Sequence, residues 1–423
     1  MISDILHIRS KENPHKTFIY YNCKKYSFNE FDNIVNSIAS FISIGFPKKI
    51  HVNIKNKLFF FASIIACNRL QKLPILLSDG FKVKPDINDS IIDKIDITNN
   101  RTVKNLEYKK DETQAVVFSS GTTGDPKGAE LTFNNFYQSS IIWNNNFNFD
   151  EHDIYLNMLP LNHVSGLCIM FRALYNNFAV RIEEYSIAFL NKMEYQECTY
   201  ISLVPTMLYD IIINDLSYKF EFFKKIILGG SKASAELLSK AIELNLPIYS
   251  VYGMTETCSS IAGAEINRLN YNNIKYKSFR NVDIDVENSS IVINSPTVMK
   301  KYVNDENSIS KFFTNDIGKL DKSGNLVIIG RSDDIIISGS ENFSSDIIEK
   351  AINQIDEVNK CTVLGINDLR LGMKIIAFVE TEDKSIKAED IYKEIKNKIP
   401  KKMFPKNIYF VEKIDKIEKD KYL

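Results

Sequence analysis

The chain has 423 residues, of which 44% are hydrophobic and 25% are charged, a composition that is typical of folded globular proteins and excludes long disorder. A chain of this length exceeds what one compact core usually holds, so we expect two or more domains. Lysine plus arginine and aspartate plus glutamate both number 53, so the net charge is zero. This balance indicates neither a nucleic acid nor an anionic membrane as partner.

The cysteines and the apolar runs bear on the cellular compartment. None of the six cysteines has C-x-x-C spacing, so we expect reduced thiols and no zinc or redox site. The N-terminal segment carries charges where a signal peptide needs an apolar stretch, and the longest apolar run, residues 58–67, is too short to span a bilayer. The sequence therefore predicts a cytoplasmic protein.

The first 253 residues alternate between helical and strand-like patterns. Apolar residues recur at helical spacing in residues 27–44, with Ser27 as the N-cap, and further helices are expected at residues 58–67 and 132–145. Strands are expected at residues 49–54, 73–77, 153–160, 178–182, 199–205, 224–230 and 248–253. This βαβ rhythm predicts a mostly parallel sheet covered by helices.

The pattern changes after residue 281. Short alternating strands separated by Asn and Gly turns, up to residue 329, predict a small antiparallel sheet or a barrel-like part. Beyond "GRSDD" (residues 330–334), strands alternate with two helices in a set typical of a small α+β domain. In the first of these helices, Ile347, Ala351 and Ile355 are expected to share a face. We therefore place the domains at residues 1–332 and 333–423.

The segment "SSGTTGDPKG" (residues 119–128) follows the apolar run 115–118. A glycine-rich turn between a buried strand and a helix presents backbone N–H groups to an anion, and Ser, Thr and Lys127 add further donors. The sequence therefore predicts a phosphate site, with a flexible surface turn as the alternative. The P-loop of kinases and GTPases is excluded, because Gly128 follows the lysine where that motif needs Ser or Thr.

This segment resembles the phosphate loop of adenylate-forming enzymes, which include acyl- and aryl-CoA synthetases, adenylation domains and luciferases. The family's other signatures follow in order: "PLNHVSG" (160–166), "ILGGS" (227–231), "YGMTET" (252–257), "TNDIG" (314–318) and "GRSDDIIISGSENFSSDIIE" (330–349). The resemblance implies an AMP-forming acid–thiol ligase. A carboxylate attacks the α-phosphate of Mg·ATP, and a thiol such as that of coenzyme A then expels AMP.

The resemblance also assigns roles to single residues. The residues implied for the β- and γ-phosphates are Ser119, Ser120, Gly121, Thr122, Thr123, Gly124 and Lys127. Those implied for the adenosine are Gly229, Gly230, Ser231, Tyr252 and Gly253, with Asp316 and Arg331 at the ribose. Glu256 would ligate Mg²⁺, Thr255 would contact the α-phosphate, and His163 would lie against the acyl carboxylate.

Several of these residues also have a plain structural interpretation. Glu256 fits an ion pair with a lysine, and Tyr252 fits a core position. Asp316 fits an ordinary turn, and His163 fits a structural histidine.

In the family the C-terminal domain is mobile and rotates between the two reaction steps. The resemblance places the hinge at Asp333, the thiol tunnel at Gly339 and the catalytic lysine at Lys421. Lys419 and Lys416 are rivals for that lysine, and a solvated basic tail is the alternative.

Segments 200–212 and 224–259 are most similar to the o-succinylbenzoate–CoA ligases of menaquinone synthesis. Such an acid carries a second carboxylate, for which Arg172 is a candidate partner, although it also fits a helix-surface arginine. The expected partners are a small carboxylic acid, ATP, Mg²⁺ and coenzyme A. A stand-alone adenylation enzyme that loads a carrier protein and a nucleotide-binding pseudoenzyme stay open as alternatives, as do the acid itself and a homodimer.

Overall fold

The structure is a computed structural model, and it describes residues 1–43, 45–77, 90–95, 106–119, 127–194, 197–331, 335–338, 341–368, 372–383 and 385–414. The chain divides into two compact units. The first comprises Met1–Asp285, Val292–Phe312 and Asp321–Val327, and the second comprises Val286–Ile291, Phe313–Leu320 and Ile328–Leu423. The predicted domain boundary between residues 332 and 333 lies outside the described residues and stays a prediction.

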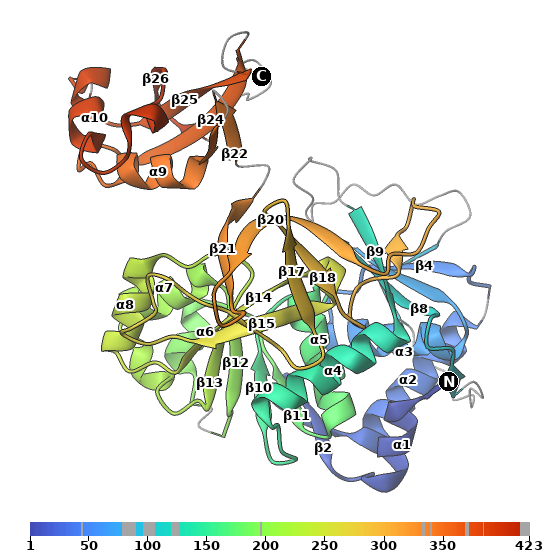
Figure 1. The fold of residues 1–423 in the computed structure, drawn as a ribbon. Coiled ribbons are helices and arrows are strands. Elements are labelled where there is room, and N and C mark those ends of the chain that lie inside the picture. Colours follow the sequence, from blue (N-terminus) through green and yellow to red (C-terminus); the bar gives the residue numbers. More distant parts are fainter. Residues whose placement is uncertain are drawn as a thin grey trace. The chain divides into compact units, whose positions relative to one another are not determined.

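A nine-stranded sheet dominates the first unit, in the order β16-β15-β14-β13-β12-β10-β11-β2-β3 (Figure 1). Its central strands are parallel, and antiparallel strands lie at both ends. The bounds are β2 Thr17–Tyr21, β3 Lys24–Ser27, β10 Ile154–Asn157, β11 Ala179–Ile182, β12 Tyr200–Leu203, β13 Lys225–Leu228, β14 Ile248–Met254, β15 Ser259–Glu265 and β16 Lys277–Ser278.

A six-stranded sheet in the order β19-β9-β8-β5-β4-β6 is the second large sheet among the described residues. Its bounds are β4 Lys49–Val52, β5 Leu73–Leu76, β6 Ser90–Ile92, β8 Thr113–Ser119, β9 Lys127–Thr132 and β19 Lys301–Tyr302. Strands β4, β5, β6 and β8 pair in parallel, whereas β9 runs antiparallel to β8 and to β19. The short strands β1 (Ile2–Ser3) and β7 (Glu107–Tyr108) pair separately.

Helices α2, α3, α4 and α5 connect the two sheets. Their bounds are α1 Ile5–Glu12, α2 Phe28–Ile42, α3 Lys57–Arg69, α4 Phe133–Phe147, α5 Val164–Asn176, α6 Ile187–Lys192, α7 Pro205–Ile213 and α8 Ala235–Glu243. Helix α2 packs on β2 and on α3, which contacts the other sheet at β4, β5 and β8. Helix α5 packs on β10, β11 and β15 and on α4, which contacts β9. Helix α2 begins after Ser27, which forms the expected N-cap through a capping box with Glu30.

The segment after residue 281 forms a four-stranded sheet in the order β17-β18-β20-β21. The bounds are β17 Asp283–Glu287, β18 Ser290–Asn294, β20 Phe312–Leu320 and β21 Leu326–Arg331. The two-residue turn between β17 and β18 has positive φ at Asn288 and Ser289, which is the geometry of a tight hairpin. Of the two predicted alternatives, the small sheet is observed and the barrel-like part was wrong. Among the described residues the edge strands β17 and β21 do not pair, so the sheet stays open.

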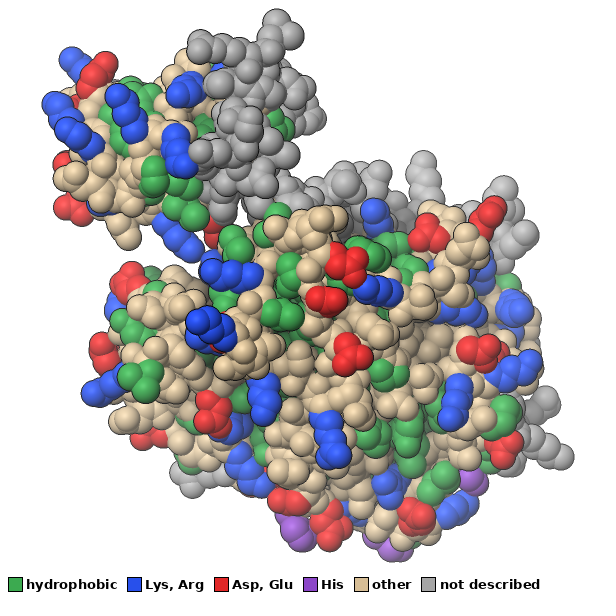
Figure 2. All heavy atoms as spheres, in the orientation of Figure 1, with side chains coloured by type: hydrophobic (Ala, Val, Ile, Leu, Met, Phe, Trp, Pro, Cys, Tyr) green, Lys and Arg blue, Asp and Glu red, His purple; other side chains and the backbone are tan. Residues whose placement is uncertain are grey.

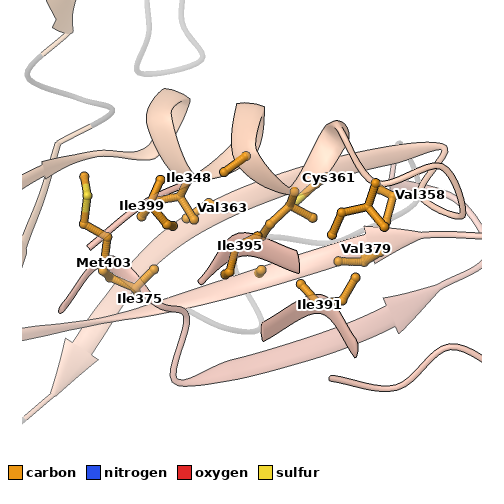
Figure 3. Packing of buried hydrophobic residues seen from close by; sticks show 14 of the residues in the cluster. Ile348, Val358, Cys361, Val363, Ile375, Val379, Ile391, Ile395, Ile399 and Met403 are labelled. Atoms are coloured by element: carbon orange, nitrogen blue, oxygen red, sulfur yellow. The ribbon is translucent and has the colours of Figure 1, made fainter. Parts of the chain in front are cut away.

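The second unit contains an α+β core of its own. Its elements are β22 Ile335–Ser338, β23 Glu341–Ser344, α9 Ser345–Asn353, β24 Lys360–Asp368, β25 Gly372–Glu380, α10 Ala388–Ile395 and β26 Asn407–Val411. Figure 3 shows Ile348, Val363, Ile375 and Ile391 directed toward one another from α9, the sheet and α10. The shared face predicted for Ile347 was wrong: this side chain is 45% exposed, and α9 buries the neighbouring Ile348 instead.

The charged side chains, the cysteines and the helices bear on the predicted partners and compartment. Basic and acidic side chains are interspersed on the face drawn in Figure 2. All six cysteines are free, and all except Cys23 are buried. No helix in the described part of the chain is long and apolar enough to cross a membrane.

Candidate active site

The motif "YGMTET" lies where β14 ends and turns into β15. Strands β14 and β15 approach so closely at Gly253 that a Cβ there would lie 2.4 Å from the carbonyl oxygen of Ser259. The short 3₁₀ turn Thr255–Thr257 follows, and the Thr257 hydroxyl donates to the carbonyl of Ser259 over 2.7 Å. This turn therefore holds Glu256 in a fixed place between the two strands.

Glu256 is a buried carboxylate, 8% exposed, without a basic partner among the described residues. The Tyr302 hydroxyl donates to its Oε1 atom over 2.9 Å. The alternative of an ion pair with a lysine is thus not seen in the described part of the chain. Mg²⁺ in nucleotide sites is typically held by one or two carboxylates together with the phosphates, and a buried carboxylate with one oxygen left over fits that mode.

Lys127 lies next to this carboxylate through the same tyrosine. Its Nζ atom is 5.6 Å from the centroid of the Tyr302 ring, within the range of a cation–π contact. Burial and the Glu256 carboxylate raise the pKa of Tyr302, so its hydroxyl stays protonated and can donate. The fold therefore gathers Lys127 and Glu256 around one side chain that sequence reasoning missed.

The described ends of the glycine-rich segment lie side by side, because Ser119 at the end of β8 pairs with Lys127 at the start of β9. The Ser119 hydroxyl donates to the Lys127 carbonyl over 3.4 Å. The expected strand-to-helix turn was wrong: the next described element is strand β9, and helix α4 begins only at Phe133. The residues expected on the phosphates that lie outside the described part are Ser120, Gly121, Thr122, Thr123 and Gly124.

The residues expected around adenine lie at the carboxyl ends of neighbouring parallel strands. Gly229, Gly230 and Ser231 follow β13, and Tyr252 lies near the end of β14, which pairs with β13 in parallel. In open α/β sheets this edge is where ligands bind. Tyr252 is 9% exposed, so it also fits the alternative interpretation as a core residue.

Asp316 and Arg331, expected at the ribose, form a pair in the second unit. Arg331 lies 3.8 Å from the Asp316 carboxylate. Asp316 lies inside strand β20, so the ordinary-turn alternative was wrong. Its backbone N–H donates to the hydroxyl of Thr314, which fixes the strand locally.

His163 caps the N-terminus of α5 without a side-chain hydrogen bond to the helix. Burial lowers the pKa of His163, so its imidazole is neutral at pH 7. Close packing sets the start of this helix, because a Cβ on Gly166 would lie 2.3 Å from the carbonyl oxygen of Pro160.

Arg172, on the same helix, is 1% exposed, so the alternative of a helix-surface arginine was wrong. Its guanidinium carbon lies 3.5 Å from the Trp143 ring centroid, and it donates to the Ser259 hydroxyl. Its Nε atom has no hydrogen-bond partner, and no described carboxylate pairs with it. Burial lowers the pKa of Arg172, as expected for a cation without a counter-charge.

The remaining assigned residues lie outside the described residues. They are the hinge Asp333, the tunnel residue Gly339 and the three candidate lysines Lys416, Lys419 and Lys421. Their roles stay predictions. No cluster of three or more metal-ligating side chains occurs among the residues that the structure describes.

The sequence model of the AMP-binding enzyme family matches residues 71–303, more than half of the chain, and that of the AMP-binding enzyme C-terminal domain matches residues 347–421. The chain belongs to the AMP-binding enzyme family. This confirms the predicted resemblance and the prediction of an enzyme.

Several relatives of this AMP-binding enzyme carry one name. The 2-succinylbenzoate–CoA ligase of Staphylococcus epidermidis ATCC 12228 is 29% identical over 359 residues, which cover 81% of this chain and 73% of the relative. The ligase of the same name from Staphylococcus aureus RF122 is 30% identical over 356 residues, which cover 80% and 70%.

Solved structures show the same fold. The o-succinylbenzoate CoA synthetase of Bacillus subtilis, in complex with its acyl-adenylate intermediate, superposes with a TM-score of 0.85 at 24% identity, covering 97% of this chain and 95% of the other. The same synthetase with ATP and magnesium gives a TM-score of 0.83 at 24% identity, with 97% and 96% covered. The predicted α/β fold, with mostly parallel sheets and a small C-terminal α+β domain, is confirmed.

Proposed function

We propose that this AMP-binding enzyme is an o-succinylbenzoate–CoA ligase of menaquinone synthesis. The observation that carries this proposal is Arg172, a fully buried guanidinium without a carboxylate partner in the described part of the chain. The names of its relatives among the curated proteins support the same acid.

A buried charge is costly unless a counter-charge compensates for it. Arg69, the other arginine that is buried in the described residues, contacts Asp4 over 2.8 Å and Asp32 over 2.5 Å. Arg172 instead stacks on the Trp143 ring and donates to the Ser259 hydroxyl, close to the turn that holds Glu256. A substrate with a second carboxylate would supply the missing counter-charge, and o-succinylbenzoate has one.

The reaction would proceed in two steps. In the first, one carboxylate oxygen of the acid attacks the α-phosphorus of ATP, and the bond to pyrophosphate breaks. In the second, the sulfur of coenzyme A attacks the acyl carbon, the thiol proton is lost and AMP leaves. The substrates would be o-succinylbenzoate, ATP and coenzyme A, with Mg²⁺ bound to the phosphates.

This chain's residues would act on the first step through charge and position. Lys127 would hold the β- and γ-phosphates, and Thr255 would donate to the α-phosphate. Neutral His163 would lie against the acyl carboxylate without forming a competing ion pair. Glu256 would hold Mg²⁺, which when bound spreads the negative charge of the phosphates. Lys421 stays our candidate for bridging the acid and the α-phosphate.

The test is ATP–pyrophosphate exchange with a panel of acids, followed by the choice between free coenzyme A and a phosphopantetheinyl carrier. We expect exchange with o-succinylbenzoate and formation of its coenzyme A thioester. Exchange with a fatty or amino acid alone would refute the substrate, and transfer only to a carrier would indicate a stand-alone adenylation enzyme. Absence of exchange with every acid would indicate a pseudoenzyme. A cytoplasmic location and a homodimer also stay proposals, which cell fractionation and light scattering would test.

A further inference from the structure

Tyr302 joins the two charged groups of the candidate nucleotide site. Its hydroxyl donates to Glu256 Oε1 over 2.9 Å, and its ring faces the Lys127 ammonium at 5.6 Å. One side chain therefore contacts both the Glu256 carboxylate and the Lys127 ammonium.

The backbone around Tyr302 is fixed to the same two elements. The Met299 N–H donates to the Glu256 carbonyl over 2.8 Å, and the Val303 N–H donates to the Gly128 carbonyl over 2.9 Å. Strand β19 therefore bridges the Glu256 turn and the strand that begins with Lys127. Because the backbone is held on both sides of Tyr302, its side chain has little freedom to turn away from Glu256 and Lys127.

We propose that Tyr302 is a positioning residue that orients the Glu256 carboxylate toward Mg²⁺ and restricts Lys127 for the phosphates; this rests on the proposed function only for the use of Mg·ATP. A hydrogen bond to Oε1 leaves the second oxygen for the cation. The donor is neutral, so it adds no positive charge that would repel the metal, as a lysine would. The ring face attracts the ammonium without neutralising it.

The test compares Tyr302→Phe, which keeps the ring, with Tyr302→Leu, which removes both contacts. Calorimetry measures the binding of Mg·ATP, and of ATP in EDTA, in the absence of any acid. We expect Tyr302→Phe to weaken Mg·ATP on the order of tenfold and metal-free ATP by less than about twofold, because only the bond to the charged carboxylate is lost. Tyr302→Leu should weaken both. The matched control is Tyr209→Phe, a 53% exposed tyrosine on α7.

A double-mutant cycle with Glu256→Gln separates positioning from general destabilisation. If Tyr302 acts through Glu256, adding Tyr302→Phe to Glu256→Gln should not weaken Mg·ATP further. Additive losses, equal losses for Mg·ATP and metal-free ATP, or unchanged Mg·ATP binding in Tyr302→Phe would overturn the proposal. Because no acid is present, an incorrect substrate assignment would leave these results readable.

Discussion

Arg69 and Arg172 are both buried in the described part of the first unit, and they are held in opposite ways. Arg69 lies between the carboxylates of Asp4 and Asp32. Asp4 also accepts a hydrogen bond from the Tyr108 hydroxyl over 2.9 Å, which holds the N-terminal residues in place. Arg172 has a ring face and a hydroxyl but no carboxylate. The first pattern is structural, and the second suits a charged ligand.

We expect Arg172→Met to leave the folded state as stable as the wild type or more so, because an unpaired buried charge is replaced by an apolar side chain. The same variant should lose about tenfold or more in kcat/KM for o-succinylbenzoate relative to an aryl acid with one carboxylate. Thermal melts and thioester assays measure the two effects. Arg69→Met is the control, and it should destabilise by roughly 3–5 kcal/mol because it leaves buried carboxylates unpaired. Unchanged acid preference in Arg172→Met would refute the role of Arg172.

His163 gives a prediction for pH. Burial lowers its pKa below the ordinary value of about 6.5, so the folded state binds fewer protons than the unfolded chain just below that pH. This histidine therefore reduces stability as the pH falls from about 7 toward 5. His163→Gln should show a smaller drop in melting temperature between pH 7.5 and 5.5 than the wild type. His152→Gln, at a side chain that is 90% exposed, should behave like the wild type.

At the scale of elements, the first turn of α5 is tightly packed. It carries His163 at its start, and Gly166 approaches the Pro160 carbonyl too closely for a side chain. We expect Gly166→Ala to destabilise by about 1–3 kcal/mol and to raise KM for the acid, because the turn must shift. Melting curves and acid titrations measure both, with the exposed neighbour Ser165→Ala as control. Equal behaviour of the two variants would show that the helix start adapts without cost.

The sequence pattern predicted single helices correctly, but it did not predict which element follows the glycine-rich segment. The helix expected at residues 27–44 is observed as Phe28–Ile42 with its capping box, because spacing and cap lie within one stretch of chain. Strand β9 was missed, since its pairing with β8 is not visible in the sequence of either strand alone.

At the scale of the whole molecule, the core of the second unit consists of residues between 336 and 403. Ile391 lies in that core and is fully buried, whereas Ile347 on α9 is 45% exposed. The chain has one tryptophan, Trp143, and it belongs to the first unit. Its fluorescence therefore reports on the first unit alone.

We expect Ile391→Ala to destabilise the second unit by about 2–5 kcal/mol through the cavity it leaves. In denaturant, the circular dichroism signal should begin to change before Trp143 fluorescence does. Ile347→Ala should keep the two transitions as they are in the wild type. If Ile391→Ala shifts both signals together, the two units unfold as one.

The sequence by itself determined the family, the order of the motifs and most helices and strands, because these depend on neighbouring residues and their spacing. It named Lys127 and Glu256 but offered no reason to choose Tyr302. It also left two interpretations of Arg172 open, a partner for a substrate carboxylate and a helix-surface arginine. Only the tertiary structure decided these points. Burial and contacts between distant strands arise when the sheets and helices pack together, and no local pattern records which side chains then meet.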